Sequence, residues 1–419
     1  MFASVGARDA WRDVQWWQVY PLGALGADTT GRREFEGQPL SALIPWLYHA
    51  RDLGCNGLAL GPIFAAELHG YDTLDYFEVD PRLGTRTDFD TLVGAAHDAG
   101  FKVMLDGVFN HVSKNSPLAR HGLLRYEGDS PACFEGHGQL LELDHASTEV
   151  EQLVADVMQF WLDAGADGWR LDAAYAVPTD FWRRVLDRVK LTHPDAYFMA
   201  EVIHGDYGKF VAGSGVDTVT QYELWKSIWS SINDRNMHEL AWTLTRHNGF
   251  CSQFLPWTFV SNHDVTRIAS KVSPRDLPVA TALLCALPGI PAVYYGDELG
   301  WEGVKEERFG GDDAIRPPLP KFPPAAKSRP DVFHQYQQLL GLRRRVPHLA
   351  RTEQLVVDGG AIAFTVFDEG GTPVLDFAGF VGDGDYVFDL PGAATFGDRC
   401  EDLGDHVRLF AGGWYVRQR

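Results

Sequence analysis

The sequence predicts an α/β protein: a (β/α)8 TIM barrel with a short excursion after its third strand and a small antiparallel β domain at the C-terminal end. Three observations favour this class. Short apolar segments alternate with longer segments of helical periodicity, eight such pairs precede residue 345, and from about residue 350 short β-prone segments are separated by glycine-containing turns. A chain of 419 residues suits one large barrel with a small second domain.

The candidate barrel strands are eight apolar segments, at residues 16–23, 56–64, 102–109, 167–173, 197–203, 216–223, 258–263 and 292–298. Helical patterns separate them, so we expect the strands to pair in parallel. Eight strand–helix units favour a closed barrel. An open doubly wound sheet is the alternative, but no GxGxxG sequence follows the first strand.

The candidate helices cover residues 41–54, 87–100, 147–166, 179–192, 206–213, 225–247, 274–287 and 332–344. Apolar residues recur at helical spacing in these segments, which predicts helices that pack one face on the barrel. Thr87 is a typical N-cap residue and Gly100 a typical C-terminal residue, so we expect them to bound one helix.

Three domains follow from this pattern. The catalytic barrel is predicted to comprise residues 1–111 and 146–349, and the C-terminal β domain residues 350–419. Residues 112–145 are too long for an ordinary βα connection and show little periodicity. We therefore expect them to form a short inserted domain or loop after the third strand.

Composition excludes several classes of partner. The formal net charge of −20 repels nucleic acid and anionic lipid, so neither is an expected partner. The longest apolar stretch, residues 280–295, contains two prolines and is too short to span a bilayer, and the first residues do not resemble a signal peptide. Five widely spaced cysteines without a CxxC pair favour reduced thiols. These features predict a cytoplasmic protein, and they leave its oligomeric state open.

Polar residues gather where four of the predicted strands end. They are Asp106, Asn110, His111, Arg170, Asp172, Glu201, His263 and Asp264. Each has an ordinary alternative, since an aspartate at a strand end often caps a helix, a histidine is often structural and an arginine can neutralise a nearby acid. Because the C-terminal ends of barrel strands converge, we expect the whole set to share one site. Clustered acids there would repel one another without a compensating role.

Three acids around one arginine suit glycosidic bond cleavage, which needs one carboxylate at the reacting carbon and one carboxylic acid at the leaving oxygen. Asp172 lies two residues after Arg170 on the same strand face, and the cation is expected to keep it ionised as a nucleophile. Glu201 follows an apolar segment, which predicts a raised pKa and a general-acid role. Asp264 could bind sugar hydroxyls.

Four segments resemble the signature regions of the α-amylase family of glycoside hydrolases: DGVFNH (106–111), GWRLDAA (168–174), FMAEV (198–202) and FVSNHD (259–264). Their order and strand positions also match. Two further stretches, residues 69–85 and 289–300, agree with the family, so the resemblance covers roughly residues 14–345. It is closest to intracellular members that act on oligosaccharides.

The resemblance implies a role for each of ten residues. Asp172 resembles the nucleophile, Glu201 the general acid/base, Asp264 the transition-state stabiliser and Arg170 the arginine that orients the nucleophile. The residues implied to bind or surround the substrate are Tyr71, Asp106, His111, Arg170, His263, Asp313 and Arg316. Asp106 resembles the structural aspartate of the first motif and Tyr71 the aromatic platform under the sugar.

The sequence also departs from the family pattern. Ala200 stands before the general acid where glycine is common, and Asp144 stands where many members have asparagine, so its role is open. The loop at residues 26–37 lacks the alternating acids that many members use to hold calcium. Although Asn110 matches a calcium-ligand position, we expect no metal or other cofactor to be required.

These features together predict a retaining hydrolase of α-glucosidic bonds in short α-glucans or disaccharides. A transferring or isomerising member of the family would share the same residues, so it is kept as the alternative. A binding protein without activity would be expected to lack an acid or Arg170, yet all are present. A metal-dependent hydrolase is disfavoured because no HExxH or similar spacing occurs.

Overall fold

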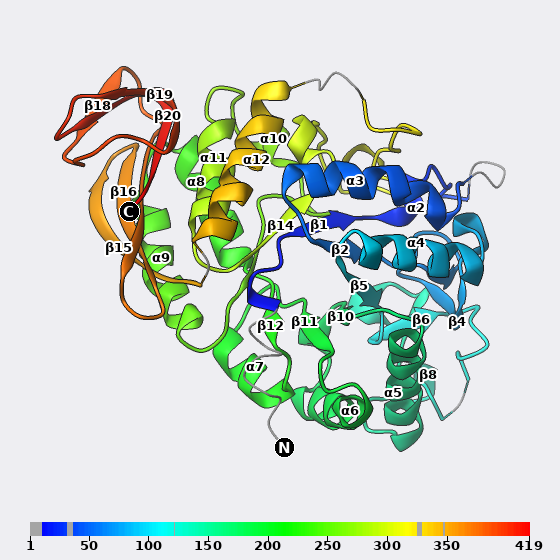
Figure 1. Cartoon of the computed structure of the whole chain (residues 1–419). Coiled ribbons are helices and arrows are strands. Elements are labelled where there is room, and N and C mark those ends of the chain that lie inside the picture. The colour runs from blue at the N-terminus through cyan, green and yellow to red at the C-terminus, as the bar shows by residue number, and fades with distance from the viewer. Residues whose placement is uncertain (1–10, 32–36, 121, 325–328, 347) are drawn as a thin grey trace.

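The structure is a computed structural model that describes residues 11–31, 37–120, 122–324, 329–346 and 348–419. Its centre is a parallel eight-stranded sheet in the order β12-β11-β10-β5-β2-β1-β14-β13 (Figure 1). The strands are β1 (Trp16–Val19), β2 (Gly57–Leu60), β5 (Lys102–Gly107), β10 (Gly168–Leu171), β11 (Tyr197–Ala200), β12 (Thr218–Val219), β13 (Trp257–Thr258) and β14 (Ile290–Tyr294).

The two end strands of this order meet and close the barrel. Thr220, directly after β12, forms a parallel bridge with Trp257 of β13. The Gln221 amide donates to the Trp257 carbonyl at 2.9 Å, and the Thr218 hydroxyl donates to the Leu255 carbonyl at 2.6 Å. Closure leaves no free sheet edge. The predicted fold class, a (β/α)8 barrel with a C-terminal β domain, is confirmed.

Large apolar side chains fill the barrel interior near the N-terminal ends of the strands. The Trp16 ring lies between those of Trp11 and Trp257, and its centroid is 6.0 Å from the first and 5.3 Å from the second. Met104 and Met199 belong to the same buried cluster. Barrel interiors are normally filled by side chains in this way. With this end filled, the polar residues lie at the opposite, C-terminal ends of the strands.

Helices surround the sheet (Figure 1). The longer ones are α3 (Ile44–Leu53), α4 (Arg86–Asp98), α5 (Thr148–Asp163), α6 (Thr179–Thr192), α7 (Tyr207–Ser214), α8 (Tyr222–Asn233), α9 (His238–Cys251), α11 (Leu277–Ala286) and α12 (Pro330–Arg345); α2 (Pro21–Ala24) and α10 (Ile268–Lys271) are single turns. No helix of the described residues is long and apolar enough to cross a membrane.

Two predictions about helices are wrong. The single helix expected at residues 225–247 is two helices, α8 and α9, and Arg235 between them has a φ of 51°, which an α-helix cannot accommodate. The N-cap of α4 is Thr85 rather than Thr87, because Asp88 accepts hydrogen bonds from both the amide and the hydroxyl of Thr85, at 3.0 and 2.9 Å. Gly100 does follow the helix end, with a φ of 82°.

The strands are shorter than predicted, and the residues beyond them form irregular segments. The segment expected as one strand at residues 56–64 ends at Leu60, and its last residue begins a separate hairpin of β3 (Phe64–Ala66) and β4 (Thr73–Val79). The excursion after the third barrel strand contains β6 (His111–Ser113) paired with β9 (Leu140–Glu142), and a small hairpin of β7 (Tyr126–Glu127) and β8 (Ser130–Pro131).

The C-terminal part is an antiparallel sheet of β15 (Leu349–Asp358), β16 (Ala361–Asp368), β17 (Pro373–Phe380), β18 (Asp385–Phe388), β19 (Phe396–Asp402) and β20 (Val407–Gln418). It lies beside the barrel helices, away from β10 and β11 (Figure 1). Asn248 of α9 and Thr352 of β15 exchange two hydrogen bonds of 2.8 Å that join the sheet to the barrel. All five cysteines are free thiols.

Candidate active site

The predicted site residues lie at, or just beyond, the C-terminal ends of the barrel strands. Asp106 is the last residue but one of β5, and Arg170 is the last but one of β10. Asp172 directly follows β10, and Glu201 directly follows β11. Parallel pairing sets Arg170 beside Asp106 in register. Arg170 and Asp106, which are 64 positions apart in the sequence, thereby become neighbours.

The Arg170 guanidinium is the centre of the site. Its Nη1 contacts both oxygens of Asp106, at 2.7 and 2.6 Å, and Oδ1 of Asp172 at 3.1 Å. Its Nη2 contacts Oε1 of Glu201 at 2.9 Å. The four side chains are between 0% and 11% exposed. A planar fork of donors can hold several carboxyl groups in fixed positions, whereas a single ammonium cannot.

Glu201 accepts two further hydrogen bonds. The Ala173 amide donates to Oε2 at 3.1 Å and the Tyr222 hydroxyl donates to Oε1 at 3.1 Å. Ala173 has a φ of 43°, a left-handed conformation that is unusual for a residue other than glycine and turns the chain sharply after Asp172. Glu201 does follow a buried apolar strand, but three donors, from Arg170, Ala173 and Tyr222, also reach its carboxyl group.

Asp264 connects to the same cluster through its neighbours. His263 Nε2 lies 3.0 Å from Asp264 Oδ2 and also against the Tyr71 hydroxyl, which donates to Asp106 Oδ2 at 3.1 Å. On a second path, Asn262 accepts from the Asp264 amide at 2.8 Å and donates to the Tyr222 hydroxyl at 3.0 Å. The structure thus brings all three predicted catalytic acids into one hydrogen-bonded network.

Aromatic rings form one wall of the site. Tyr71 and His263 stack with an interplanar angle of 2° and centroids 5.4 Å apart, and Tyr20 continues the stack. His111 is held by the Tyr71 carbonyl, 3.0 Å from its Nε2, and stacks on Phe134 of the inserted segment at 4.7 Å. Tyr20 and His263 are buried, whereas Tyr71 is partly exposed, so Tyr71 is the ring of these three that a sugar can contact.

Arg316 lies at the other side of Asp264. Its Nη2 contacts Asp264 Oδ1 at 2.9 Å and Asp312 Oδ2 at 3.0 Å, and its Nε donates to the His263 carbonyl at 2.8 Å. Besides Asp264, the acid paired with this arginine is Asp312, and Asp313, which the resemblance places beside the substrate, is exposed. The two aspartates are adjacent in GGDD, and the sequence carries no signal that distinguishes them.

Burial raises the pKa of Asp172 well above its usual range; Arg170 lowers it, but Glu201 and Asp106 raise it further. The pKa of Asp106 is also raised, by burial, despite its contact with Arg170. This direction differs from the prediction that Arg170 keeps Asp172 ionised. The physical reason is burial of the carboxyl group first, and then the charges of the neighbouring carboxyl groups, which the single Arg170 guanidinium does not offset.

Asp264 differs from Asp172 in its electrostatics. Burial would raise its pKa, but the charges of His263 and Arg316 and the hydrogen bond from His263 outweigh that effect, and the pKa is lowered. Asp264 is therefore ionised at neutral pH. Burial lowers the pKa of His111 to about 4, so this imidazole is neutral and can exchange hydrogen bonds with hydroxyl groups.

The inserted segment contributes to the rim of the site. Glu135 of the 3-10 helix Phe134–Gly136 accepts a 2.8 Å hydrogen bond from the Tyr175 hydroxyl, three residues after Asp172. The Tyr175 ring lies 5.7 Å from that of His204. Asp144, whose role the sequence left open, accepts from the Ala146 amide at 3.0 Å and so stabilises a local turn.

No group of three or more His, Cys, Asp and Glu side chains within the described residues is placed to hold a metal ion. Part of the loop at residues 26–37 that was compared with calcium-binding loops, residues 32–36, lies outside the described residues, as do residues 1–10 of the N-terminal segment. Independence from calcium therefore stays a prediction.

Sequence reasoning missed Tyr222 and Asn262, which join Glu201 to Asp264. Asn262 directly precedes the predicted site residue His263, and Tyr222 is in the sixth predicted strand. Their position at the end of an apolar segment is the signal that could have identified them.

Comparison with known proteins identifies the alpha-amylase catalytic domain over residues 27–121 and 134–321. The chain belongs to the alpha-amylase family. It is 30% identical over 410 residues to the cyclomaltodextrinase of Geobacillus thermopakistaniensis strain MAS1, covering 87% of this chain and 66% of that protein. It is also 30% identical over 346 residues to neopullulanase 2 of Thermoactinomyces vulgaris, covering 76% of this chain and 57% of that protein.

Among solved structures of the family, the cyclic α-maltosyl-(1→6)-maltose hydrolase of Arthrobacter globiformis superposes with a TM-score of 0.79 at 25% identity, covering 98% of this chain and 99% of that one. The predicted resemblance to the α-amylase family is thus confirmed. The chain spans only 66% and 57% of the length of the two curated relatives above.

Proposed function

We propose that the protein is a retaining glycoside hydrolase that cleaves α-glucosidic bonds in short α-glucans or disaccharides. One observation carries the proposal: Asp172 and Glu201 contact the two ends of the same buried guanidinium, Nη1 and Nη2 of Arg170. Retaining enzymes need their two carboxyl groups about 5–5.5 Å apart, close enough for one to attack the sugar carbon while the other protonates the leaving oxygen.

In the first step, an oxygen of Asp172 attacks the anomeric carbon as the bond to the leaving oxygen breaks, and Glu201 gives its proton to that oxygen. The product is a glycosyl–Asp172 ester with inverted configuration. Asp264, ionised and fixed by His263 and Arg316, stabilises the positive charge that develops on the sugar.

In the second step, Glu201 removes a proton from water, whose oxygen attacks the anomeric carbon and releases Asp172. The second inversion restores the original configuration. A sugar hydroxyl in place of water would give transfer instead of hydrolysis. Transfer uses the same residues, so it remains the alternative outcome of the same reaction.

The names of the relatives support α-glucans as substrates. They include a cyclomaltodextrinase, a neopullulanase and an intracellular maltogenic amylase of Bacillus subtilis, which is 29% identical over 335 residues. That last name also supports a cytoplasmic location for this protein. We accordingly place maltotriose and cyclic maltodextrins first among the candidate substrates.

Product analysis tests the proposal. The protein is incubated with maltose, maltotriose, isomaltose, sucrose, trehalose, pullulan and a cyclic maltodextrin, and the products are separated. Release of free glucose or maltose supports hydrolysis, and longer or re-linked sugars support transfer. The first-formed anomer, followed by NMR, should be α; a β anomer, or no turnover of any α-glucoside, would refute the proposed mechanism.

Activity should survive treatment with a calcium chelator, because no step above uses a metal. Rates are compared before and after chelation and after calcium is restored. Loss of activity that calcium restores would show that a metal is required.

A further inference from the structure

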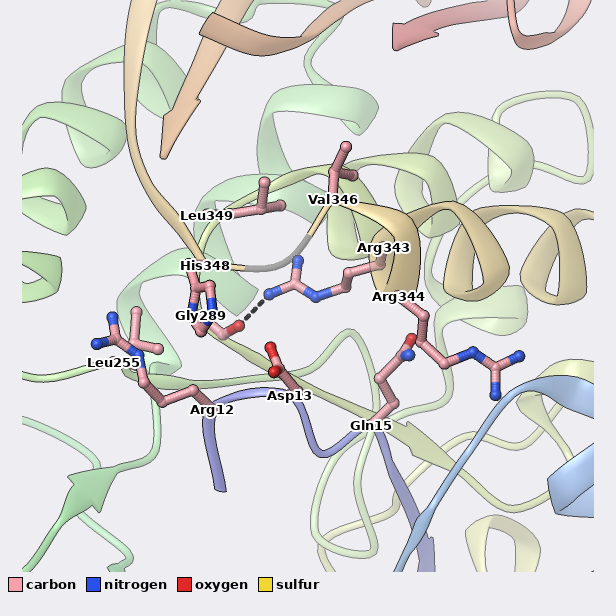
Figure 2. Close-up of a pocket in the computed structure, with 10 residues that line it drawn as sticks. All are labelled: Arg12, Asp13, Gln15, Leu255, Gly289, Arg343, Arg344, Val346, His348 and Leu349. Atoms are coloured by element: carbon pink, nitrogen blue, oxygen red, sulfur yellow. Dashed lines mark hydrogen bonds between the residues drawn. The ribbon is translucent and has the colours of Figure 1, made fainter. Parts of the chain in front are cut away.

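A second polar site lies at the opposite end of the barrel from the acids. A small hollow that opens to solvent is bordered by the segment before β1, by residues that precede β13 and β14, and by the end of α12 (Figure 2). The polar side chains around it are Arg12, Asp13, Gln15, Arg343, Arg344 and His348. Because these residues precede the strands, the hollow shares no residue with the candidate active site.

Positive charge at this hollow is only partly compensated. Arg343 donates through Nη1 to the carbonyls of Cys285 and Leu287, at 3.1 and 2.6 Å, and through Nη2 to the carbonyl of Gly289. Within the described part of the chain, neither Arg343 nor Arg344 forms an ion pair with a carboxylate. Arg12, by contrast, is paired with Glu369 of the C-terminal sheet.

Gln15 presents both halves of its amide to the hollow without a partner. The residue is 2% exposed, and neither Nε2 nor Oε1 has a hydrogen-bond partner among the described residues. Its backbone is fixed, since its amide donates to Asn56 Oδ1 at 2.8 Å and its carbonyl accepts from the Asn56 amide at 3.0 Å. His348 Nδ1 is likewise buried without a partner in the same part of the structure. Buried polar groups are normally satisfied, so these atoms call for a ligand or ordered water.

The arrangement specifies the chemistry of such a ligand. Guanidinium groups and the Gln15 Nε2 group donate hydrogen bonds, so the ligand must carry negatively charged acceptor oxygens. The Gln15 Oε1 atom and the Asp13 carboxylate accept, so the ligand must also carry an O–H group. Near neutral pH inorganic phosphate has both, because its hydrogen phosphate form keeps one proton, and a sugar phosphate has both through its sugar hydroxyl groups, whereas sulfate has no O–H group.

We propose that this hollow binds inorganic phosphate or a small phosphate ester, held by Arg343, Arg344 and Gln15. In Figure 2 the side chains of Asp13 and Gln15 point from the segment before β1 toward the end of α12 that carries the two arginines. The ligand would thus bridge the start of the first barrel strand and the last barrel helix, next to the beginning of the C-terminal sheet.

A purely structural account exists for Arg343, because its guanidinium satisfies carbonyls at the end of α11. It does not account for Gln15 or Arg344, so these two residues carry the test. Arg345 is the matched control: it is one residue further along α12, has the same charge, donates to the Gly341 carbonyl at 3.2 Å and does not border the hollow.

Calorimetric titration of the full chain with inorganic phosphate, a hexose phosphate and sulfate, in a buffer free of other oxyanions, tests the proposal. We expect saturable phosphate binding and sulfate binding at least about tenfold weaker. Gln15→Leu and Arg344→Gln should each weaken phosphate binding by about tenfold or more, while Arg345→Gln leaves it unchanged. Tighter binding of the hexose phosphate would identify an ester as the preferred form.

Thermal unfolding of the same variants provides the second measurement. Without phosphate, Gln15→Leu should melt at the same or a higher temperature, since it removes an unpartnered amide. Added phosphate should raise the melting temperature of only the unmodified chain and the Arg345→Gln variant. The proposal is overturned if phosphate does not bind, if sulfate binds equally well, or if Arg345→Gln weakens binding as much as Arg344→Gln does.

Discussion

At the scale of single residues, the site depends on Arg170. Its contacts to Asp106, Asp172 and Glu201 are all buried, and removal of one partner from a buried charge cluster leaves the others uncompensated. Burial raises the pKa of Asp172, and the charges of Glu201 and Asp106 raise it further.

Asp172→Asn should reduce kcat by at least about a thousandfold, because an amide cannot form the glycosyl ester. The fold should persist, since the amide keeps the shape of the carboxyl group and removes a buried acid whose pKa is raised. Initial rates and thermal melting are the measurements. Asp98→Asn changes an exposed acid at the end of α4 and is the control; retained turnover in Asp172→Asn would refute the nucleophile assignment.

Glu201→Gln should separate the two roles of this residue. The aryl oxide of an activated aryl glycoside leaves without protonation. The rate of the first step should therefore fall about a hundredfold or more less for this substrate than for a maltooligosaccharide. Burst kinetics with the aryl glycoside would show the accumulated glycosyl enzyme. Equal losses on both substrates would contradict the acid role.

At the scale of elements, the start of α4 shows how a helix boundary is set. Thr85 donates to Asp88 through both its amide and its hydroxyl, and Ser41 donates to the other oxygen of Asp88 at 2.9 Å. The Asp88 pKa is lowered, first by the hydrogen bond from the Thr85 amide and then by that from its hydroxyl. Thr87, two residues later, is exposed and lies inside the helix.

Thr85→Ala should therefore destabilise the protein by about 1 kcal/mol, the usual effect of losing an N-cap residue. Thr87→Ala should change stability by less than about 0.5 kcal/mol, since it removes an exposed side chain within the helix. Urea unfolding of the two variants compares them directly. A larger effect at Thr87 would restore the boundary that the sequence suggested.

At the scale of the whole molecule, buried neutral histidines make stability depend on pH. Burial lowers the pKa of His247 to about 4. The ring is 0% exposed, with Nε2 2.9 Å from the Pro288 carbonyl and Nδ1 3.3 Å from Gln221 Nε2. A neutral ring satisfies both contacts, as donor to the carbonyl and acceptor from the amide. A second proton would have no acceptor at Nδ1.

Between about pH 4 and 6.5 the unfolded chain therefore binds a proton at His247 that the folded chain does not. The free energy of unfolding should fall as the pH is lowered through this range, and His247 should account for up to about 3 kcal/mol of the fall. Above about pH 6.5 the contribution of His247 should not change with pH. Melting curves at several pH values measure the effect. His247→Gln should flatten the dependence, and the control His334→Gln, at an exposed position on α12, should not.

The sequence alone determined the barrel, the order of its strands and the identity of the three acids and Arg170 as neighbours. It could do so because apolar periodicity reports burial and because the ends of parallel strands converge whatever the side chains are. It also placed Asp264 beside His263 by adjacency, and the described contacts agree.

Only the tertiary structure decided which atoms meet. It showed that Asp312 pairs with Arg316, that Tyr222 and Asn262 join Glu201 to Asp264, and that three hydrogen-bond donors reach Glu201. These contacts depend on loop geometry and on strand ends that are far apart in the sequence. The direction of a pKa also depends on how many carboxyl groups share one arginine, and that number is set by packing in three dimensions, which periodicity along the chain does not encode.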